Sequence, residues 1–474
     1  MNGTPLPRRE ACRTLATVAV LLPFANPLTA AEPTPPAVLE GYTGQVSYAP
    51  DDELTLHLSA TAATCSVEIV RLGARPESVW KRDGIATELR TVPATASSHG
   101  CNWPVSVALK LPAAWRSGYY QVRLRATGAP PPASGGTCFF VLRNAPHGPR
   151  ARILLQLSTN TYNAYNNYGG FSLYGYNGRD GNQGHRVSFQ RPPASQFNSW
   201  EEPFVVWAEQ NGIELDYAAN SDLEFHPDVL TGRKLVLSVG HDEYWSAPMR
   251  DSLEKFIAQG GHVAFFSGNT CCWQVRSEDQ GQALTSWKQN YHSDPIYQAR
   301  QSRATLSSLW SHYLVRRPET ELTGVGFLWG GYHLSHGQLM DGSGAFTVHR
   351  PEHWIFAGTG LKSGEAFGGK DTIVGYECDG CQLTWRDGLP YPTHRDGTPE
   401  SFEILGTAPA QWHPDDCQWY DEWENGRQGH AVLGVYTRGG TVFTCGSTDW
   451  AHGLRGGDPM VRRITRNILD RLGA

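Results

Sequence analysis

Hydrophobic and polar residues alternate in several short segments of the first third of the chain. A period of two is typical of β-strands with one buried face, and no segment of helical period separates them. We therefore predict an antiparallel β-sandwich for residues 41–145. The clearest predicted strands are residues 53–58, 66–72, 105–111, 119–125 and 138–142.

After the turn-rich residues 144–150, apolar runs alternate with amphipathic segments. Ser246 can cap a helix that has Pro248 in its first turn and Gly260 at its end. Strand, helix and strand in this order predict an α/β domain over residues 150–474, with a parallel sheet and helices on its faces. The predicted strands are 153–157, 213–217, 234–239, 262–266, 372–376, 431–436 and 440–445, and the other predicted helices are 202–210 and 458–472.

The first 31 residues have the pattern of a signal peptide, with a basic start, an apolar stretch and small residues before the cleavage point. The pair Arg8 and Arg9 suggests a leader of the twin-arginine type, and residues 32–40 form a proline-rich linker. A membrane anchor fits less well, because Pro23 and Pro27 interrupt an apolar run that is too short to span a bilayer. We expect an exported protein, periplasmic or extracellular, with no membrane contact after processing.

Composition narrows the choice of partners. The net charge is −6, with acidic and basic residues mixed along the chain, which argues against a nucleic-acid partner. Aromatic residues make up 11% of the chain and include 16 Trp, as expected for a globular protein with many ring-lined surfaces. The sequence leaves the oligomeric state open, including a homo-oligomer.

The chain contains 10 cysteines, one of them in the predicted leader. In an oxidising compartment several of the others are expected to form disulfides, for example Cys101 with either Cys65 or Cys138. The spacing of Cys378 and Cys381 also matches half of a zinc site. Because no second pair has this spacing, a disulfide is the better interpretation.

The most informative motif is GHDEYWS, residues 240–246, at the junction of a predicted buried strand and a helix. Sites in open α/β sheets are built at this carboxyl edge. His241 and Glu243 are two residues apart, so in an extended chain their side chains point the same way and can act together. In the competing interpretation, Asp242 caps the helix and His241 is only hydrogen-bonded.

A second motif, TNTYNAYNNYGG at residues 159–170, follows the first predicted strand of the same domain. If the two strands are neighbours, it lies beside the first motif. Tyr162, Tyr165 and Tyr168 recur at every third position among asparagines. Taken alone, this pattern favours a turn with stacked rings over a metal site.

Together with FFSGN (265–269), GYECDG (375–380) and GSTDW (446–450), these motifs resemble the C-terminal region of the N,N-dimethylformamidase large (beta) subunit family. The resemblance runs from Arg150 to the end and loosely includes SGYYQVRL (117–124). It implies a glutamine-amidotransferase-like α/β fold after a β domain, and hydrolysis of a small amide at a mononuclear ferric iron. The family also has a small partner subunit, and whether this chain needs one stays open.

In this family the iron is held by two tyrosines and one glutamate. The match within HDEYW gives Glu243 as the glutamate ligand. Tyr165 in AYN is preferred to Tyr162 as one tyrosine ligand, and Tyr120 in SGYY is preferred to Tyr119 as the other. Phenolate and carboxylate oxygens are hard anionic donors that suit ferric iron, and three protein ligands leave positions open for water and substrate.

The resemblance also gives His241 as the residue that assists catalysis, with Asn269 and Glu377 as outer or substrate-facing groups. An amide is a poor electrophile, so the metal is expected to polarise its carbonyl or to acidify a bound water. His241 can take the proton of that water and later protonate the leaving amine. Glu377 can orient the histidine or assist the transfer.

Weaker candidates come in pairs: Cys271 and Cys272, His333 and His336, and Asp449 and His452. The adjacent cysteines raise a thiol nucleophile of the glutamine-amidotransferase kind, but they lack a clear elbow motif and are better explained as structural. The two loop histidines rarely make a zinc site at that spacing. The last pair can line the pocket or serve as ordinary loop hydrogen-bonders.

Two other functions remain open at this point. The aromatic loops would also suit a non-catalytic exported protein that binds carbohydrate. A hydrolase of another substrate class could use the same site, because neither fold nor metal determines the substrate. Convergence of Tyr120, Tyr165 and Glu243 within a few ångströms would favour the enzyme over the binding protein.

Overall fold

The computed structural model describes residues 38–474, except for 128–134, 146–147, 149, 301, 336–337, 340–342 and 413–427. The predicted signal peptide and residues 32–37 of the predicted linker lie outside the described residues, as do His336, Cys12 and Cys417. The segment Ala37–Ala474 forms one compact unit. Among the described residues, no helix is both long and apolar enough to cross a bilayer.

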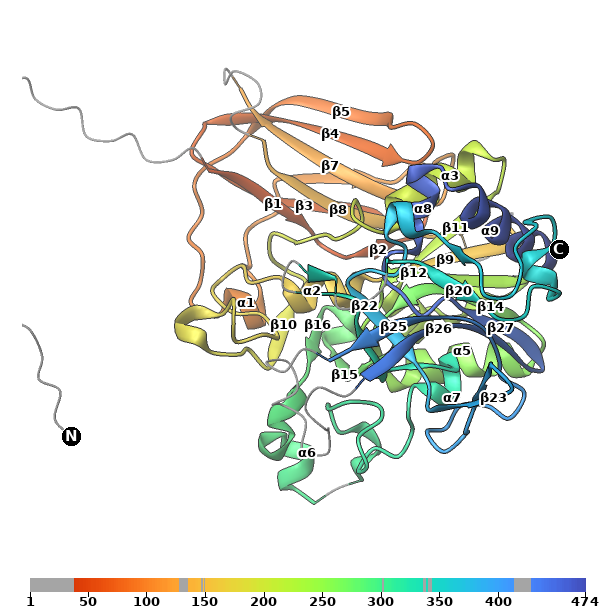
Figure 1. The fold of residues 1–474 in the computed structure, drawn as a ribbon. Coiled ribbons are helices and arrows are strands. Elements are labelled where there is room, and N and C mark those ends of the chain that lie inside the picture. The colour runs from red at the N-terminus through yellow and green to blue at the C-terminus, as the bar shows by residue number, and fades with distance from the viewer. Residues whose placement is uncertain are drawn as a thin grey trace, which may run out of the picture. The chain divides into compact units, whose positions relative to one another are not determined.

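Within the described part of residues 38–145, the strands form two sheets, with orders β1-β3-β6 and β2-β8-β7-β4-β5 (Figure 1). Their pairing is antiparallel except between β2 and β8. Leu56, Val67 and Val122 come from both sheets and share one buried core. The strands are β1 (Leu39–Thr43), β2 (Ser47–Tyr48), β3 (Glu53–Ala60), β4 (Thr64–Leu72), β5 (Glu77–Ala86), β6 (Val107–Lys110), β7 (Gly118–Ala126) and β8 (Thr137–Leu142), with the short helix α1 (Ala96–His99).

The largest sheet of the described residues has 11 strands, most of them in the order β11-β9-β12-β14-β27-β26-β25-β17-β22. The first five run parallel, as predicted, and the others pair antiparallel. The strands are β9 (Ile153–Leu157), β11 (Leu215–Ala219), β12 (Leu235–His241), β14 (His262–Gly268), β17 (Gly326–Tyr332), β20 (Phe346–Val348), β21 (Ala366–Phe367), β22 (Glu377–Gly380), β25 (Glu403–Gln411), β26 (Gln428–Arg438) and β27 (Gly440–Thr444). Since β9 pairs directly with β12, the two motifs that follow these strands are brought together.

Successive residues of the parallel strands enter different cores, which explains why these strands are continuously apolar in sequence. Leu155 packs in one core with side chains of α3, α8 and α9, whereas Leu154 packs in another with side chains of α4 and α5. The N-cap predicted for α5 is confirmed, because Ser246 Oγ accepts a hydrogen bond from Met249 N at 3.4 Å. The helices are α3 (Glu201–Gln210), α4 (Asn220–Phe225), α5 (Ala247–Ala258), α8 (Trp450–Gly456) and α9 (Pro459–Leu472).

Smaller elements complete the described chain. A four-stranded sheet has the order β10-β16-β15-β13, and two hairpins pair β18 with β19 and β23 with β24. These elements are β10 (Arg186–Ser188), β13 (Tyr244–Ser246), β15 (Trp273–Glu278), β16 (Ala283–Thr285), β18 (Leu334–Ser335), β19 (Gln338–Leu339), β23 (Leu383–Arg386), β24 (Leu389–Pro392), α6 (Pro295–Gln298) and α7 (Thr320–Thr323).

Two local predictions are wrong. Residues 372–376 form a turn and not a strand, because Ser447 Oγ donates to Ile373 O and accepts from Gly375 N in place of a neighbouring strand. The apolar residues of this turn are buried, which produced the strand-like pattern. The tyrosine motif is also not a simple turn, since it forms the helix α2 (Thr159–Tyr165).

The disulfides expected from the sequence are not formed among the described cysteines. All eight are free and buried, namely Cys65, Cys101, Cys138, Cys271, Cys272, Cys378, Cys381 and Cys445. Cys65 and Cys138 lie in the core shared by the two N-terminal sheets, whereas Cys101 lies in a separate cluster. Cys378 and Cys381 likewise belong to different cores, which explains why the C-x-x-C spacing makes neither a disulfide nor half of a zinc site.

Candidate functional site

His241 and Glu243 meet at the carboxyl end of β12. His241 Nε2 lies 3.2 Å from Glu243 Oε2, and both side chains are buried, so the predicted same-side arrangement is confirmed. Asp242 points the other way and accepts hydrogen bonds from Gln156 Nε2 at 2.6 Å and Ser238 Oγ at 2.8 Å. Asp242 therefore belongs to a polar network beneath the site and does not cap the helix.

Glu377 and Asn269, which the sequence placed near the substrate, also reach this point. Glu377 opens β22, and its Oε2 lies 2.8 Å from His241 Nε2. Neither ring nitrogen of His241 makes an aligned hydrogen bond, and Asn269 Oδ1 has no partner. Burial lowers the pKa of His241, but the charges of Glu377 and Glu243 outweigh burial and raise this pKa to about 10.

Two tyrosine hydroxyls converge on the Glu243 carboxylate. Tyr165, at the end of α2, donates to Glu243 Oε2 at 3.0 Å. Tyr174 lies in the loop after α2, and its hydroxyl is 3.0 Å from both carboxylate oxygens and 2.7 Å from Tyr165 Oη. A hydrogen bond from Leu173 N to Ala164 O returns the loop to the helix. Three oxygen-bearing side chains thus share one small volume.

The environment keeps both hydroxyls protonated. Burial, and next the charge of Glu243, raises the pKa of Tyr165 well above its usual value. The same two causes, in the same order, raise the pKa of Tyr174. A cation placed among these oxygens would reverse this balance, because it would favour the phenolate form and release protons.

Lys288 and Tyr244 extend the cluster on one side. Tyr244 donates to Tyr174 Oη at 2.7 Å, and Lys288 Nζ donates to Tyr244 Oη at 2.9 Å. The ammonium also lies 3.3 Å from the centroid of the Tyr174 ring. Burial lowers the pKa of Lys288 to about 8, although the charge of Glu243 acts in the opposite direction. Lys288 therefore brings a buried, readily titrated positive charge to the phenol pair.

Tyr165, Tyr174 and Glu243 border a cavity of about 180 Å³. The rest of its lining is mostly aromatic and aliphatic. The lining residues are Tyr165, Tyr174, Tyr176, Glu243, Asn269, Cys272, Trp273, Leu309, Phe327, Tyr332, Tyr376, Glu377 and Trp412. Sites for drug-sized ligands have volumes of about 300–1,000 Å³. This cavity is therefore suited to a molecule of only a few heavy atoms.

Tyr120 does not belong to this cluster, which corrects its choice as a partner of Glu243. Its hydroxyl donates to Arg116 O at 2.6 Å, and its ring stacks on Trp115 and Phe140 in the core of the N-terminal sheets. The alternative Tyr119 points to the opposite face of β7 and is hydrogen-bonded to Ser195.

The other alternative, Tyr162, is hydrogen-bonded to the buried carboxyl of Glu201. Tyr168 donates instead to Glu40 at 2.6 Å. Of the three regularly spaced tyrosines, Tyr165 is the one that contacts Glu243.

The weaker candidates lack the properties that chemistry requires. Burial raises the pKa of both Cys271 and Cys272 well above the usual thiol value, so neither is a ready nucleophile. His333 Nδ1 lies 2.6 Å from Pro409 O, and its Nε2 accepts from Gly344 N, which makes it a structural residue. His452 Nε2 lies 3.3 Å from Ser199 O and is also a loop contact.

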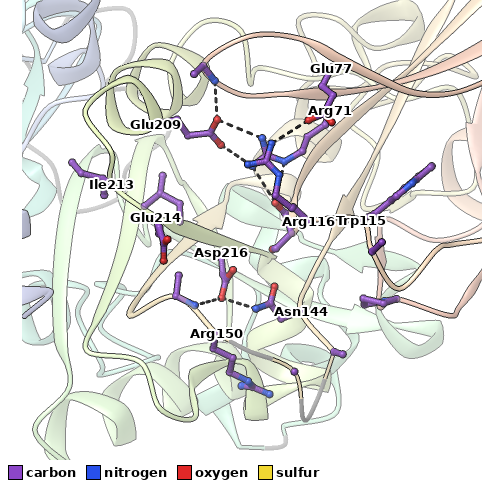
Figure 2. Close-up of a pocket in the computed structure, with 18 of the residues that line it drawn as sticks. Arg71, Glu77, Trp115, Arg116, Asn144, Arg150, Glu209, Ile213, Glu214 and Asp216 are labelled. Atoms are coloured by element: carbon purple, nitrogen blue, oxygen red, sulfur yellow. Dashed lines mark hydrogen bonds and ion pairs between the residues drawn. The ribbon is translucent and has the colours of Figure 1, made fainter.

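A second, larger cleft of about 1,050 Å³ lies where the N-terminal sheets meet the α/β region. Figure 2 shows Arg71 facing Glu209, and Asp216 between Asn144 and a backbone amide. Arg116 likewise faces Glu77 at 3.1 Å. These charged and polar groups are occupied with one another, so the cleft has the character of a packing junction.

Among the described residues, no group of three or more His, Cys, Asp or Glu residues is placed to hold a metal ion. A metal in the small cavity would consequently depend on tyrosine oxygens. Tyr165 and Tyr174 supply two such oxygens, Glu243 supplies a carboxylate, and His241 lies beside them. Sequence reasoning missed Tyr174, although it stands in an aromatic, glycine-rich loop only nine positions after Tyr165.

The chain is 25% identical over 308 residues to the beta subunit of N,N-dimethylformamidase from Alcaligenes sp, an alignment that covers 57% of this chain and 37% of that subunit. The chain thus matches little more than a third of that relative's length. The family described as "N,N-dimethylformamidase beta subunit-like, C-terminal" matches residues 66–463. Since this match includes most of the chain, the protein belongs to the N,N-dimethylformamidase beta subunit-like, C-terminal family.

Proposed function

We propose that this protein is an amidohydrolase that cleaves the C–N bond of a small linear amide at a mononuclear ferric iron site. The observation that carries the proposal is the convergence of Tyr165 and Tyr174 on Glu243, directly beside the buried His241. The stated criterion, convergence of Tyr120, Tyr165 and Glu243, is not met, because Tyr120 lies in the core of the N-terminal sheets. The proposal rests instead on Tyr174, which reaches Glu243 together with Tyr165.

The donor set fits ferric iron. Tyr165, Tyr174 and Glu243 offer two phenol oxygens and a carboxylate, which as anions would balance a trivalent cation. Both phenols are held protonated by burial and by Glu243, so their protons are the groups that a cation would displace. The orphaned Asn269 Oδ1 and the unaligned nitrogens of His241 provide polar contacts for a substrate and a water.

When bound, the iron would supply Lewis acidity toward the amide carbonyl and a water molecule. His241 then moves the proton, with Nε2 facing the cavity residues Glu243 and Glu377. Once the charge of Glu243 is taken up by a cation, Glu377 is the main group that holds a proton on His241. The pKa of His241 is then lower, so the imidazole can be neutral. A neutral His241 can accept a proton from water and later donate it to the leaving amine.

The aromatic lining favours a particular class of substrate. Trp273, Phe327 and Trp412 line the cavity together with the oxygen donors, and apolar groups can leave water for contact with these rings at little cost. A short N-alkyl amide can direct its carbonyl to the oxygen donors and its alkyl groups to the rings. N,N-dimethylformamide, after which the relative is named, has this form.

Several broader features belong to the same proposal. We propose a glutamine-amidotransferase-like fold for residues 150–474 and a β-sandwich for residues 41–145. Export with a twin-arginine leader agrees with an enzyme that acquires its metal before it crosses the membrane. We leave open in this proposal both a homo-oligomer and an additional small subunit.

The test combines metal analysis with amine release from short N-alkyl amides. We expect about one iron per chain, a visible phenolate-to-iron charge-transfer band, and activity that depends on iron. Tyr174→Phe should remove most of the band and the activity, whereas the control Tyr120→Phe should retain both. Protein that takes up no iron, or equal behaviour of the two variants, would count against the proposal.

A further inference from the structure

Two aromatic rings stand edge-on to the His241 imidazole. The centroid of the nearer Trp200 ring lies 5.4 Å from that of His241 at an interplanar angle of 77°, and the Tyr376 ring lies 6.2 Å away at 81°. One carboxylate holds both residues: Asp449 Oδ1 accepts from Trp200 Nε1 at 2.8 Å, and Asp449 Oδ2 accepts from Tyr376 N at 3.0 Å. We propose that Asp449 is a positioning residue that fixes the orientation of His241 through these two neighbours. The inference rests on the proposed role of His241.

Hydrogen bonds alone do not orient this imidazole. His241 is buried, yet neither ring nitrogen has an aligned hydrogen-bond partner. Its Nε2 lies between the carboxylates of Glu243 and Glu377, an arrangement that permits rotation toward either one. Close packing of the ring faces and edges must therefore hold the orientation.

Trp200, which directly precedes α3, constrains the backbone next to His241. It packs against the backbone of Gly240, where a Cβ added to the glycine would come within 2.2 Å of Trp200 Cβ. Gly240 also has φ +81°, a conformation that favours glycine. Because Gly240 directly precedes His241, any displacement of Trp200 acts on the backbone that carries the imidazole.

Tyr376 constrains His241 from the side of β22. Asp449 Oδ2 lies where a side chain at position 375 would begin, 1.6 Å from an ideal Cβ, so Gly375 is needed for this approach. Thr448 Oγ1 donates to Asp449 Oδ1 at 2.9 Å, and Thr448 N donates to Glu377 O at 3.1 Å. The same carboxylate thus supports the start of β22, from which Glu377 reaches His241.

Asp449→Asn tests the inference while it keeps both rings. An amide presents one acceptor in place of two, so its NH2 group must face either the Trp200 or the Tyr376 N–H. We expect kcat to fall about 10- to 100-fold, as for outer partners of other sites, with little change in KM or iron content. The pH profile of kcat should also shift. A crystal structure of the variant should show a rotated or doubled His241 imidazole.

Two further variants keep the test decisive. Trp200→Phe retains a ring against Gly240 but removes the N–H donor, and it should reproduce part of the effect even if Asp449→Asn folds poorly. Asp216→Asn is the control, because Asp216 is a buried carboxylate that accepts from two side chains, Asn144 and Arg233, and from a backbone amide, and it does not line the small cavity. It should leave kcat and the imidazole unchanged.

The structural readout separates this inference from the proposed function. If the wild type has no amidase activity but His241 rotates in Asp449→Asn and Trp200→Phe, the positioning role stands and the proposed function fails. If both variants fold and keep a wild-type imidazole, kcat and pH profile, the positioning role is overturned while the amidase remains.

Discussion

The two cavities of this protein differ most in how their polar groups are satisfied. The large cleft has nearly six times the volume of the small one, about 1,050 against 180 Å³. In the cleft, Arg71 and Glu209 lie 2.7 Å apart and neutralise each other. At the small cavity, the lining carboxylates Glu243 and Glu377 flank the buried His241, which makes no aligned hydrogen bond.

This difference is why we place the proposed chemistry at the small cavity, where the polar groups are poorly paired, and not at the larger cleft. Buried polar groups are normally paired, because an unpaired one loses its hydration without compensation. A fold that keeps His241, Asn269 and Glu377 imperfectly paired stores that free energy for a ligand. In the large cleft, Arg71 and Glu209 are paired with each other, so we expect this pair to contribute to stability.

The largest effect should come from Glu243→Gln in the small cavity. The amide keeps the shape but removes the charge toward which both phenols point, so iron affinity should fall by more than about 100-fold. Amine release should drop to the uncatalysed background. Metal analysis after dialysis measures the first effect, and full iron content in Glu243→Gln would show that the metal binds elsewhere.

Next in size is the loss of the proton carrier in His241→Gln. General acid–base groups contribute about 10²- to 10⁴-fold, and kcat should fall by a factor in this range. Since His241 is not one of the three proposed oxygen ligands, iron content and the charge-transfer band should persist. If this variant also lost iron, His241 would be a metal ligand and not only a proton-transfer group.

Third, Arg71→Met tests whether the large cleft contributes to stability and not to activity. It leaves the carboxylate of Glu209 partly buried without its main partner, which should lower the free energy of unfolding by about 3 kcal/mol. Chemical denaturation measures this loss. Activity per folded molecule should equal that of the wild type, and a large fall in kcat would show that the cleft takes part in the reaction.

The parallel half of the sheet was predictable because its strands are buried on both faces and appear as continuous apolar runs. Ile153–Leu157 was predicted with the correct limits. The pairing of β12 with β9 was left open by the sequence and is supplied by the structure. The turn at 372–376 was not predictable, since its backbone bonds go to Ser447, some 70 positions away in sequence.

The site divides in the same way. His241 and Glu243 follow from strand periodicity, because residues two apart share a side of an extended chain. The same periodicity explains why the neighbours Tyr119 and Tyr120 enter different cores. Neither reaches Glu243, because Tyr119 is hydrogen-bonded to Ser195 and Tyr120 to Arg116. Tyr174 and Lys288 depend on irregular loops, whose paths follow from tertiary contacts and not from local pattern.

The smallest expected effect concerns pH and again the pair in the large cleft. Burial raises the pKa of Glu209, but the hydrogen bonds from Arg71 and from Ala74 N, together with the nearby positive charge of Arg71, outweigh burial, and the net pKa is below the usual carboxyl value. A lowered pKa in the folded state means that the contribution to stability is complete above the unfolded-state value, near 4.5, and is lost as the pH falls through the folded-state value. Wild-type stability should therefore decline more steeply below pH 4.5 than that of Glu209→Gln, by about 1 kcal/mol or less.

Thermal unfolding between pH 3 and 7 measures the difference, with Glu77→Gln as the control because its ion pair with Arg116 is largely exposed. Equal slopes for Glu209→Gln and the wild type would show that the Arg71 pair contributes nothing through ionisation, and the contrast between the two cavities would then rest on the His241 site alone.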